Sequence, residues 1–139
     1  MSQATNYAEE KILNALFRGG SLGVPANWHF GLLSAVSDLE AGTVTELSGS
    51  GYARQAIAPG SGTFKDPATA TQGETNNVAA ITWASSAAAA WGSPTHVGIY
   101  DASTGGNLWF VIALGTAPGA IAIGNKVEAA AAAVKLTLS

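Results

Sequence analysis

The sequence predicts an all-β fold, a jelly-roll-like antiparallel β-sandwich with a short N-terminal helix. Helical periodicity is confined to the first twenty residues, and from residue 24 onward Gly, Pro, Asn and Ser mark turns at short, regular intervals. Such spacing of turns is typical of a sandwich or barrel. The 139 residues suit one domain with its own core. We therefore expect an N-terminal helical arm over residues 1–20 and a β-sandwich domain over residues 21–139.

The predicted helix has clear end signals. Asn6, with Glu9 three residues later, is typical of a capping-box start, and Gly19-Gly20 ends the segment. The apolar residues that recur at helical spacing are Ile12, Leu13, Leu16 and Phe17. They make one helix face apolar, so this face must dock either on the end or edge of its own β-domain or on a neighbouring subunit.

The strands follow in the rest of the chain. Those expected are Asn27–Leu33, Thr43–Leu47, Tyr52–Ala58, Val78–Trp83, Thr95–Tyr100, Asn107–Leu114, Ala120–Ile123 and Lys126–Leu138. The last contains Ala129–Ala133, which favours helix by propensity, but the alternation from Val134 to Leu138 predicts a strand. The stretch Pro59–Asn77, rich in Gly, Thr, Ser and Pro, is expected to form a long loop.

The hairpin His96–Leu114 is the clearest supersecondary signal. Its turn, from Asp101 to Gly106, contains glycines that can adopt positive φ. In a regular return strand, Leu108, Phe110, Ile112 and Leu114 would share one face, and Trp109, Val111 and Ala113 the other. Both faces are apolar, so both should be covered. A single-chain sandwich covers only its inner face, and the outer face with Trp109 must therefore meet a loop, the helix or a second subunit.

Composition excludes several classes of partner. Charged residues make up 11% of the chain, against roughly 25% in an ordinary soluble domain, which favours a surface covered by other subunits. The net charge is −3 and the six basic residues are scattered, so we expect no nucleic-acid partner. There is no cysteine, and no leader segment is expected. The uncharged stretch Leu108–Ile123 is short and broken by Gly115, Pro118 and Gly119, so it predicts two strands and a turn rather than a membrane span.

Five blocks of sequence together resemble a family of small virion structural proteins of tailed phages, variously labelled tail-fibre-like or head-decoration. The blocks are Asn6-Tyr7-x-Glu9-x-Lys11-x-Leu13, Arg18-Gly19, Ser50-Gly51-Tyr52-Ala53-Arg54-Gln55, Trp91-Gly92-x-Pro94-Thr95-His96-Val97-Gly98-Ile99-Tyr100-Asp101 and Thr104-Gly105-Gly106-Asn107-Leu108. The resemblance spans nearly the whole chain; it implies a virion structural component with a compact β-fold and carries over no catalytic residues. The labels leave its location in the particle open, and we expect it at the surface of the phage particle. The chain departs from it in the alanine runs Ala87–Ala90 and Ala129–Ala133.

The candidate interface residues are Leu13, Phe17, Tyr52, Arg54, His96, Tyr100 and Trp109. Arg54 would share a strand face with Tyr52; it could stack on an aromatic ring, pair with Asp101 or with a carboxylate across an interface, or simply face solvent. His96 could be a metal ligand or general base, or a hydrogen-bonded residue at a sheet edge. With only one other histidine and no cysteine, we expect no metal and no cofactor.

The four tryptophans, Trp28, Trp83, Trp91 and Trp109, are interpreted as core or interface anchors; a sugar-binding platform would use the same residue type. Gly49-Ser50-Gly51 looks similar to the nucleophile elbow of a Ser-His-Asp hydrolase but lacks its spacing, and no Gly-rich Lys-Ser/Thr phosphate-binding loop is present, so we expect no catalytic activity. Two functions remain. The first is a capsid decoration or cement protein that binds the major capsid protein as a homo-oligomer, with a trimer as one expectation. The second is a tail-associated or fibre-base protein that binds tail components and takes part in host contact. The lack of a shaft repeat favours decoration.

Overall fold

The computed structural model describes residues 3–69, 73–84, 91–115 and 121–138, and it confirms a β-sandwich preceded by one short helix. The helix α1 is Asn6–Phe17. The strands are β1 (Trp28–Asp38), β2 (Thr43–Glu46), β3 (Gln55–Ile57), β4 (Glu74–Asn76), β5 (Ile81–Trp83), β6 (His96–Tyr100), β7 (Leu108–Ala113), β8 (Val127–Ala129) and β9 (Lys135–Thr137). Every strand pairing between them is antiparallel.

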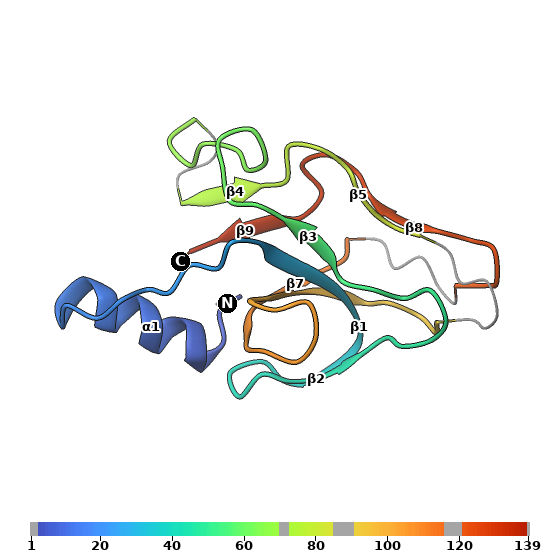
Figure 1. Ribbon diagram of the computed structural model, residues 1–139, viewed down its shortest axis with the longest axis horizontal. Coiled ribbons are helices and arrows are strands. Elements are labelled where there is room, and N and C mark those ends of the chain that lie inside the picture. The colour runs from blue at the N-terminus through green and yellow to red at the C-terminus, as the bar shows by residue number, and fades with distance from the viewer. Residues whose placement is uncertain (1–2, 70–72, 85–90, 116–120, 139) are drawn as a thin grey trace.

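One layer of the sandwich is a five-stranded sheet in the order β2-β1-β6-β7, with β3 also paired to β1 (Figure 1). The other layer consists of two two-stranded ribbons, β4–β9 and β5–β8. The pairs β6–β7, β5–β8 and β4–β9 are nested around one another in the sequence, and the bridge Gly92–Ile121 fits between the first two. The three pairs thus form one long hairpin that starts at the β6–β7 turn and is folded over into two layers, as in a jelly-roll-like fold.

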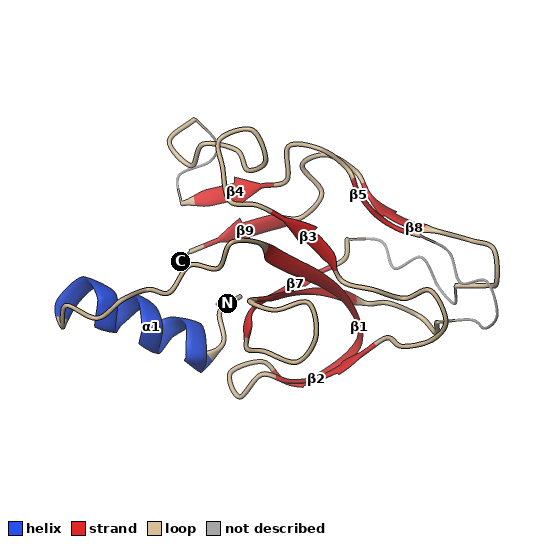
Figure 2. Ribbon diagram, viewed as in Figure 1, coloured by secondary structure: helices blue, strands red, loops and turns tan. Residues whose placement is uncertain are grey.

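The main core lies between the five-stranded sheet and the two ribbons. Phe30, Leu32 and Val97 of the sheet and Trp83 of β5 are all at most 1% exposed. The Trp83 Nε1–H group donates to the Phe30 carbonyl oxygen at 3.0 Å, so the largest core side chain also links the layers by a hydrogen bond. Figure 2 shows the strands gathered on one side and the helix projecting from their edge. This is an ordinary two-layer core, with the buried tryptophan satisfied.

A bulge in β7 changes the predicted faces of the hairpin. Tyr100 pairs with Leu108 but Ile99 pairs with Phe110, so Trp109 is the extra residue on its strand. Leu108 therefore joins Val111 in a small second cluster on the outer face of the sheet, and Trp109 faces the main core together with Phe110. The prediction of strict alternation was wrong for this reason.

The chain entry into the helix also differs from the prediction. Thr5 is the N-cap: its Oγ1 accepts from the Ala8 N–H group at 3.4 Å, whereas Asn6 is already the first helical residue. The helix ends at Phe17, Arg18 is its C-cap, and Gly19 follows with φ of +68°. The division at residue 20 stays a prediction, but Ala4 and Ala8 are buried in the same core as the strands.

The predicted strand Lys126–Leu138 is two strands, β8 and β9, with a turn between them. Ala132 in this turn has φ of +61°, and the Ala133 N–H group donates to the Ala130 carbonyl oxygen at 3.1 Å. The predicted loop Pro59–Asn77 contains β4, because Glu74–Asn76 pairs with β9. Residues 70–72 of that loop lie outside the described residues.

Other predicted boundaries shift by several residues. Tyr52–Ala58 is a strand only over β3, Val78–Trp83 only over β5, and the first strand extends to Asp38. In the predicted strand Ala120–Ile123, Ile121 forms one isolated bridge, with Gly92, and Ala120 lies outside the described residues. The alanine run Ala87–Ala90 and the predicted turn residues Pro118 and Gly119 also lie outside them. Among the described helical residues, none belongs to a helix long and apolar enough to cross a bilayer.

Candidate functional site

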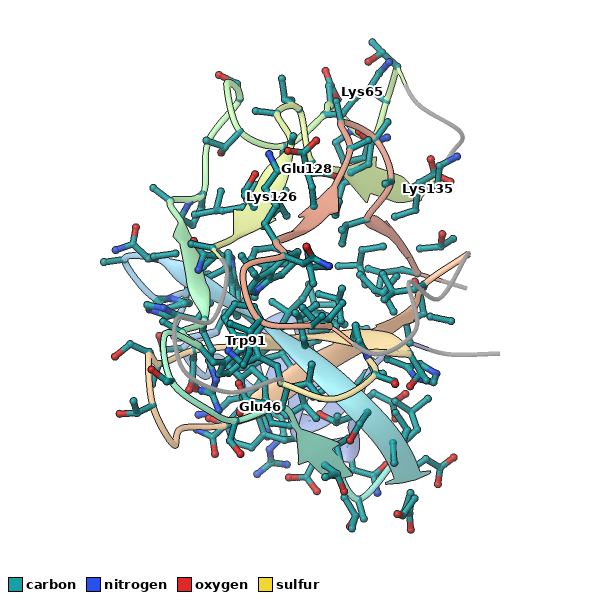
Figure 3. All side chains as sticks on the ribbon, turned by 90° about the vertical axis from the view of Figure 1, so that its right-hand side faces the viewer. Glu46, Lys65, Trp91, Lys126, Glu128 and Lys135 are labelled. Atoms are coloured by element: carbon teal, nitrogen blue, oxygen red, sulfur yellow. The ribbon has the colours of Figure 1, made fainter. Side chains whose placement is uncertain are left out.

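The structure separates the candidate residues into a polar cluster, a helix end and two isolated positions. Tyr52, Arg54 and Tyr100 meet in the polar cluster, where they are joined by Glu46 of β2. Figure 3 shows Glu46 in the lower half of the molecule below Trp91, well away from Lys126 and Glu128. Leu13 and Phe17 lie on the exposed helix, whereas His96 and Trp109 lie elsewhere in the sheet.

Arg54 is the centre of the polar cluster. Its guanidinium donates from Nε to Glu46 Oε1 at 2.9 Å and from Nη2 to Glu46 Oε2 at 2.7 Å, which is a bidentate ion pair. Its Cζ atom lies 3.5 Å from the centroid of the Tyr100 ring. The Arg54 side chain is only 8% exposed. Stacking on an aromatic ring is therefore confirmed, and the solvent-facing alternative was wrong.

The same guanidinium also holds the β6–β7 turn. Nη1 donates to the carbonyl oxygens of Ala102 and Gly105, both at 2.8 Å. The turn itself is closed by Asp101, whose carboxylate accepts from the Asn107 N–H group at 2.7 Å and from Trp109 Nε1 at 3.1 Å. Asp101 is thus a turn-capping residue and not the partner of Arg54. Arg54 ties β2 and the hairpin turn into one unit.

Tyr52 completes the cluster from the loop after β2. Its hydroxyl donates to Glu46 Oε1 at 2.8 Å and accepts from the Leu32 N–H group at 2.8 Å. The sheet makes room for this contact at Gly31, because a Cβ atom there would lie 2.7 Å from Glu46 Oε1. Any side chain at this position would push the carboxylate out of place. Sequence reasoning missed Glu46; the one signal that could have pointed to it is its charge within the predicted strand Thr43–Leu47.

The electrostatics of the cluster favour fixed protonation states. Burial raises the pKa of Tyr52 well above its usual range and that of Tyr100 to about 12. Burial alone would lower the pKa of Arg54, but the hydrogen bond and charge of Glu46 outweigh it and raise the pKa. None of these three groups is tuned to exchange protons near neutral pH, so the cluster is suited to holding structure rather than to acid–base chemistry.

The two isolated candidates have ordinary structural surroundings. His96 begins β6, which lies in the middle of the sheet and not at an edge, and its Nδ1 atom is 2.8 Å from Thr95 Oγ1. Trp109 is 2% exposed and packs edge-on against Tyr7 at 5.4 Å and Trp28 at 5.2 Å. The chain's own helix covers Trp109, which removes the argument that a second subunit must do so.

Nothing in the described ranges suggests a bound metal. Over residues 3–69, 73–84, 91–115 and 121–138, no group of three or more His, Asp or Glu side chains is placed to hold an ion. The second histidine, His29, faces Tyr100 in the pairing of β1 with β6 and is therefore distant in register from His96, which faces Leu33.

The helix end carries the most exposed large apolar side chains among the described residues. Leu13, Leu16 and Phe17 are 57%, 69% and 79% exposed, and we call these three residues the helix-end surface. Leu16 was recognised in the helical pattern but not counted as a candidate. The opposite side of α1 docks on the sandwich through Ala8, with Tyr7 and Ile12 packed against the core. The helix therefore covers its own domain, as one alternative predicted, and its second apolar face remains uncovered in the protomer. Its role as an interface stays a prediction.

Comparisons with known proteins bear on the identity of the chain. No curated protein matches it. A family model described as podophage GP4 fiber I protein gp80 matches residues 3–137, which includes the helix and every strand. The expected phage structural protein is confirmed at this level, and the fibre label fits the tail-associated alternative better than capsid decoration. The chain is a component of a phage particle and belongs to the podophage GP4 fiber I protein gp80 family.

Proposed function

We propose that the protein is a non-catalytic structural subunit of the fibre apparatus of a podophage, exposed at the particle surface and bound to tail components. The observation that carries this proposal is the match of the fibre family over residues 3–137. A fibre subunit needs a rigid domain and surfaces that bind its neighbours, and it needs no reactive group.

The polar cluster supports a structural role. Its carboxylate, guanidinium and hydroxyl groups bind one another and the backbone, and they leave no aligned nucleophile and base. The helix-end surface supports a role in assembly, because exposed apolar patches on soluble domains usually mark contact sites. The first expectation, capsid decoration with the major capsid protein as partner, has no comparable support from the family.

The experiment is to locate and count the protein in purified virions. Quantitative mass spectrometry against the major capsid protein should give a few copies to a few tens of copies per particle. Antibody-gold labelling should place these copies at the tail end. A ratio near one copy per capsid subunit, with label over the whole head, would overturn the proposal in favour of capsid decoration.

A variant tests whether the helix-end surface is used in the particle. Phage whose own copy of the gene is disrupted should be rescued by the wild-type protein and by Ile123→Glu, an exposed apolar position in the turn before β8. Phe17→Glu should rescue poorly, with the folded variant protein missing from purified particles. Equal incorporation of the two variants would show that the helix end plays no part in assembly.

A further inference from the structure

A small apolar pit lies between the five-stranded sheet and the β4–β9 ribbon. Its volume is about 150 Å³. Figure 1 shows β4 and β9 at the same end of the sandwich as the start of β1, and the pit lies at this end. Four of its seven lining side chains are aromatic and none is charged. The lining residues are Trp28, Phe30, Phe64, Thr75, Ile99, Phe110 and Leu136.

The walls of the pit are held by ring contacts and by the backbone. The Trp28 ring packs edge-on against Trp109, with the ring centroids 5.2 Å apart. Phe64 stacks on Phe30 with centroids 6.1 Å apart, and the Phe64 N–H group donates to the Gly60 carbonyl oxygen at 3.0 Å. The pit is therefore preformed, which reduces the free-energy cost of ordering its walls around a ligand.

The lining of the pit restricts the chemistry of its occupant. Its one hydroxyl group belongs to Thr75 and already donates to the Lys65 carbonyl oxygen at 2.7 Å. A buried water needs two to four polar partners, and a sugar ring with several hydroxyl groups needs more than one. No charged side chain is present in the lining to bind an ion. The pit therefore suits a neutral, apolar group.

We propose that the pit binds one neutral aromatic ring of about the size of benzene or toluene. An apolar cavity of about 150 Å³ engineered in another protein stays dry and binds benzene, so the volume fits a single ring. The aromatic walls offer the face and edge contacts that such rings prefer. A drug-sized ligand would need a pocket of roughly 300–1,000 Å³. The proposal concerns this pit alone and does not depend on where the protein lies in the particle.

Two sources can supply such a ring: a free small molecule, or a phenylalanine side chain of another chain. Toluene is the probe for the first source and N-acetyl-phenylalanine amide for the second. In the full chain with ¹⁵N-labelled indole groups, the NMR signal of the Trp28 N–H group should shift in a saturable way with toluene. The dissociation constant should be on the order of 1 mM, within the ligand-efficiency limits for seven non-hydrogen atoms. The signal of Trp91, which does not line the pit, should stay in place.

The two probes separate the sources. Saturable binding of toluene without the amide supports a site for free molecules. Binding of the amide at least as tightly as toluene supports a site for a side chain of another protein. The absence of a saturable Trp28 shift with either probe would overturn the proposal.

Variants of Leu136 test whether the ring occupies the pit. Leu136→Trp fills part of it and should weaken toluene binding at least tenfold. Leu138→Trp is the matched control, because it adds the same side chain at an exposed position outside the pit, and it should leave the dissociation constant unchanged. Circular dichroism confirms that each variant is folded before titration.

A second variant keeps the test decisive if the larger side chain is not accommodated. Leu136→Ala enlarges the pit, so the affinity for the two-ring probe indole should rise at least threefold relative to the affinity for toluene. Equal binding of toluene by Leu136→Trp and Leu138→Trp, or an unchanged preference between the probes in Leu136→Ala, would contradict a ring site at this place.

Discussion

At the scale of single residues, Asn77 shows how one buried polar side chain fixes a turn that has no special sequence. It is 2% exposed, and its Nδ2 donates to the carbonyl oxygens of Ala79 and Ala130 at 2.8 and 2.9 Å. Its Oδ1 accepts from the Val134 N–H group at 2.9 Å. The side chain thus uses three of its four hydrogen-bonding positions on backbone groups. These bonds position the turn in which Ala132 adopts positive φ, at a cost of about 1–2 kcal/mol for a residue with a Cβ atom.

Replacing Asn77 by Ala should lower the free energy of unfolding by about 2–4 kcal/mol. The substitution leaves the buried Val134 N–H group and the part-buried carbonyl oxygens of Ala79 and Ala130 without their Asn77 partner. Urea denaturation followed by tryptophan fluorescence measures the change. The control is Asn125→Ala, in the exposed turn before β8, which should change the free energy by less than about 0.5 kcal/mol. Equal effects of the two substitutions would mean that the Asn77 bonds do not hold the turn.

At the scale of secondary-structure elements, the Arg54 cluster joins segments that backbone pairing leaves separate. β2 pairs only with β1, and the β6–β7 turn lies at the end of a different hairpin. Arg54 binds a carboxylate of the first and two carbonyl oxygens of the second. The exposed pair Lys126–Glu128, at 3.4 Å and with side chains 63% and 45% exposed, joins nothing comparable and should add little to stability.

Arg54→Lys should lower the free energy of unfolding by about 2–3 kcal/mol although the charge is kept. An ammonium group cannot form the bidentate contact with Glu46, reach two carbonyl oxygens and stack flat on Tyr100 at the same time. Denaturation at neutral pH measures this loss. Lys126→Ala is the comparison for an exposed ion pair and should cost no more than about 0.5 kcal/mol. If Arg54→Lys is as mild as Lys126→Ala, the cluster does not link the two elements.

The raised tyrosine pKa values predict a loss of stability in alkali. Tyr100 has an ordinary pKa of 10.0 when exposed, and burial raises it to about 12 in the folded protein. As the pH rises, Tyr100 therefore loses its hydroxyl proton in the unfolded chain before it does so in the folded protein. Its contribution to the free energy of unfolding is fully present below pH 10 and is lost as the pH rises toward 12. The loss due to Tyr100 is on the order of 2 kcal/mol. Tyr100→Phe keeps the ring under Arg54 and should make the decline from pH 10 to 12 shallower; an unchanged decline would show that Tyr100 is not its source.

At the scale of the whole molecule, the sequence was enough to predict the class of fold but not the tertiary contacts that hold its strands and turns together. Turn spacing and the hairpin His96–Leu114 depend on local residues, and both were predicted correctly in outline. The ion pair between Arg54 and Glu46 is a tertiary contact between separate segments. Which side chains of β7 face the core depends on the bulge at Trp109, which neighbouring residues do not encode. The split of the last predicted strand required Asn77, which is more than fifty residues away in sequence. The exposed helix stripe was visible in the sequence, but only the structure shows which of its two apolar sides faces outward.

The two layers are also closed by the first described residues. The Val111 N–H group donates to the Gln3 carbonyl oxygen at 2.8 Å, which extends the sheet beyond β7. The Gln3 side chain donates from Nε2 to the Lys135 carbonyl oxygen at 3.1 Å and accepts from the Thr137 N–H group at 2.8 Å. One residue thus binds the five-stranded sheet through its backbone and the β4–β9 ribbon through its side chain. Figure 1 shows the two ends of the chain near each other at this place.

We expect Gln3→Ala to loosen the β4–β9 ribbon without unfolding the sandwich. Loss of the two side-chain bonds should lower the free energy of unfolding by about 1–2 kcal/mol. It should also speed hydrogen exchange at Thr137 and along β4, while β6 in the centre of the other sheet keeps its protection. Gln55→Ala is the matched control, because the Gln55 side-chain amide donates to the carbonyl oxygen of Ala53, two residues before it, and links no distant segments. Unchanged exchange in β9, or the same increase in both variants, would show that the ribbon is held by the apolar core alone and not by this link between the layers.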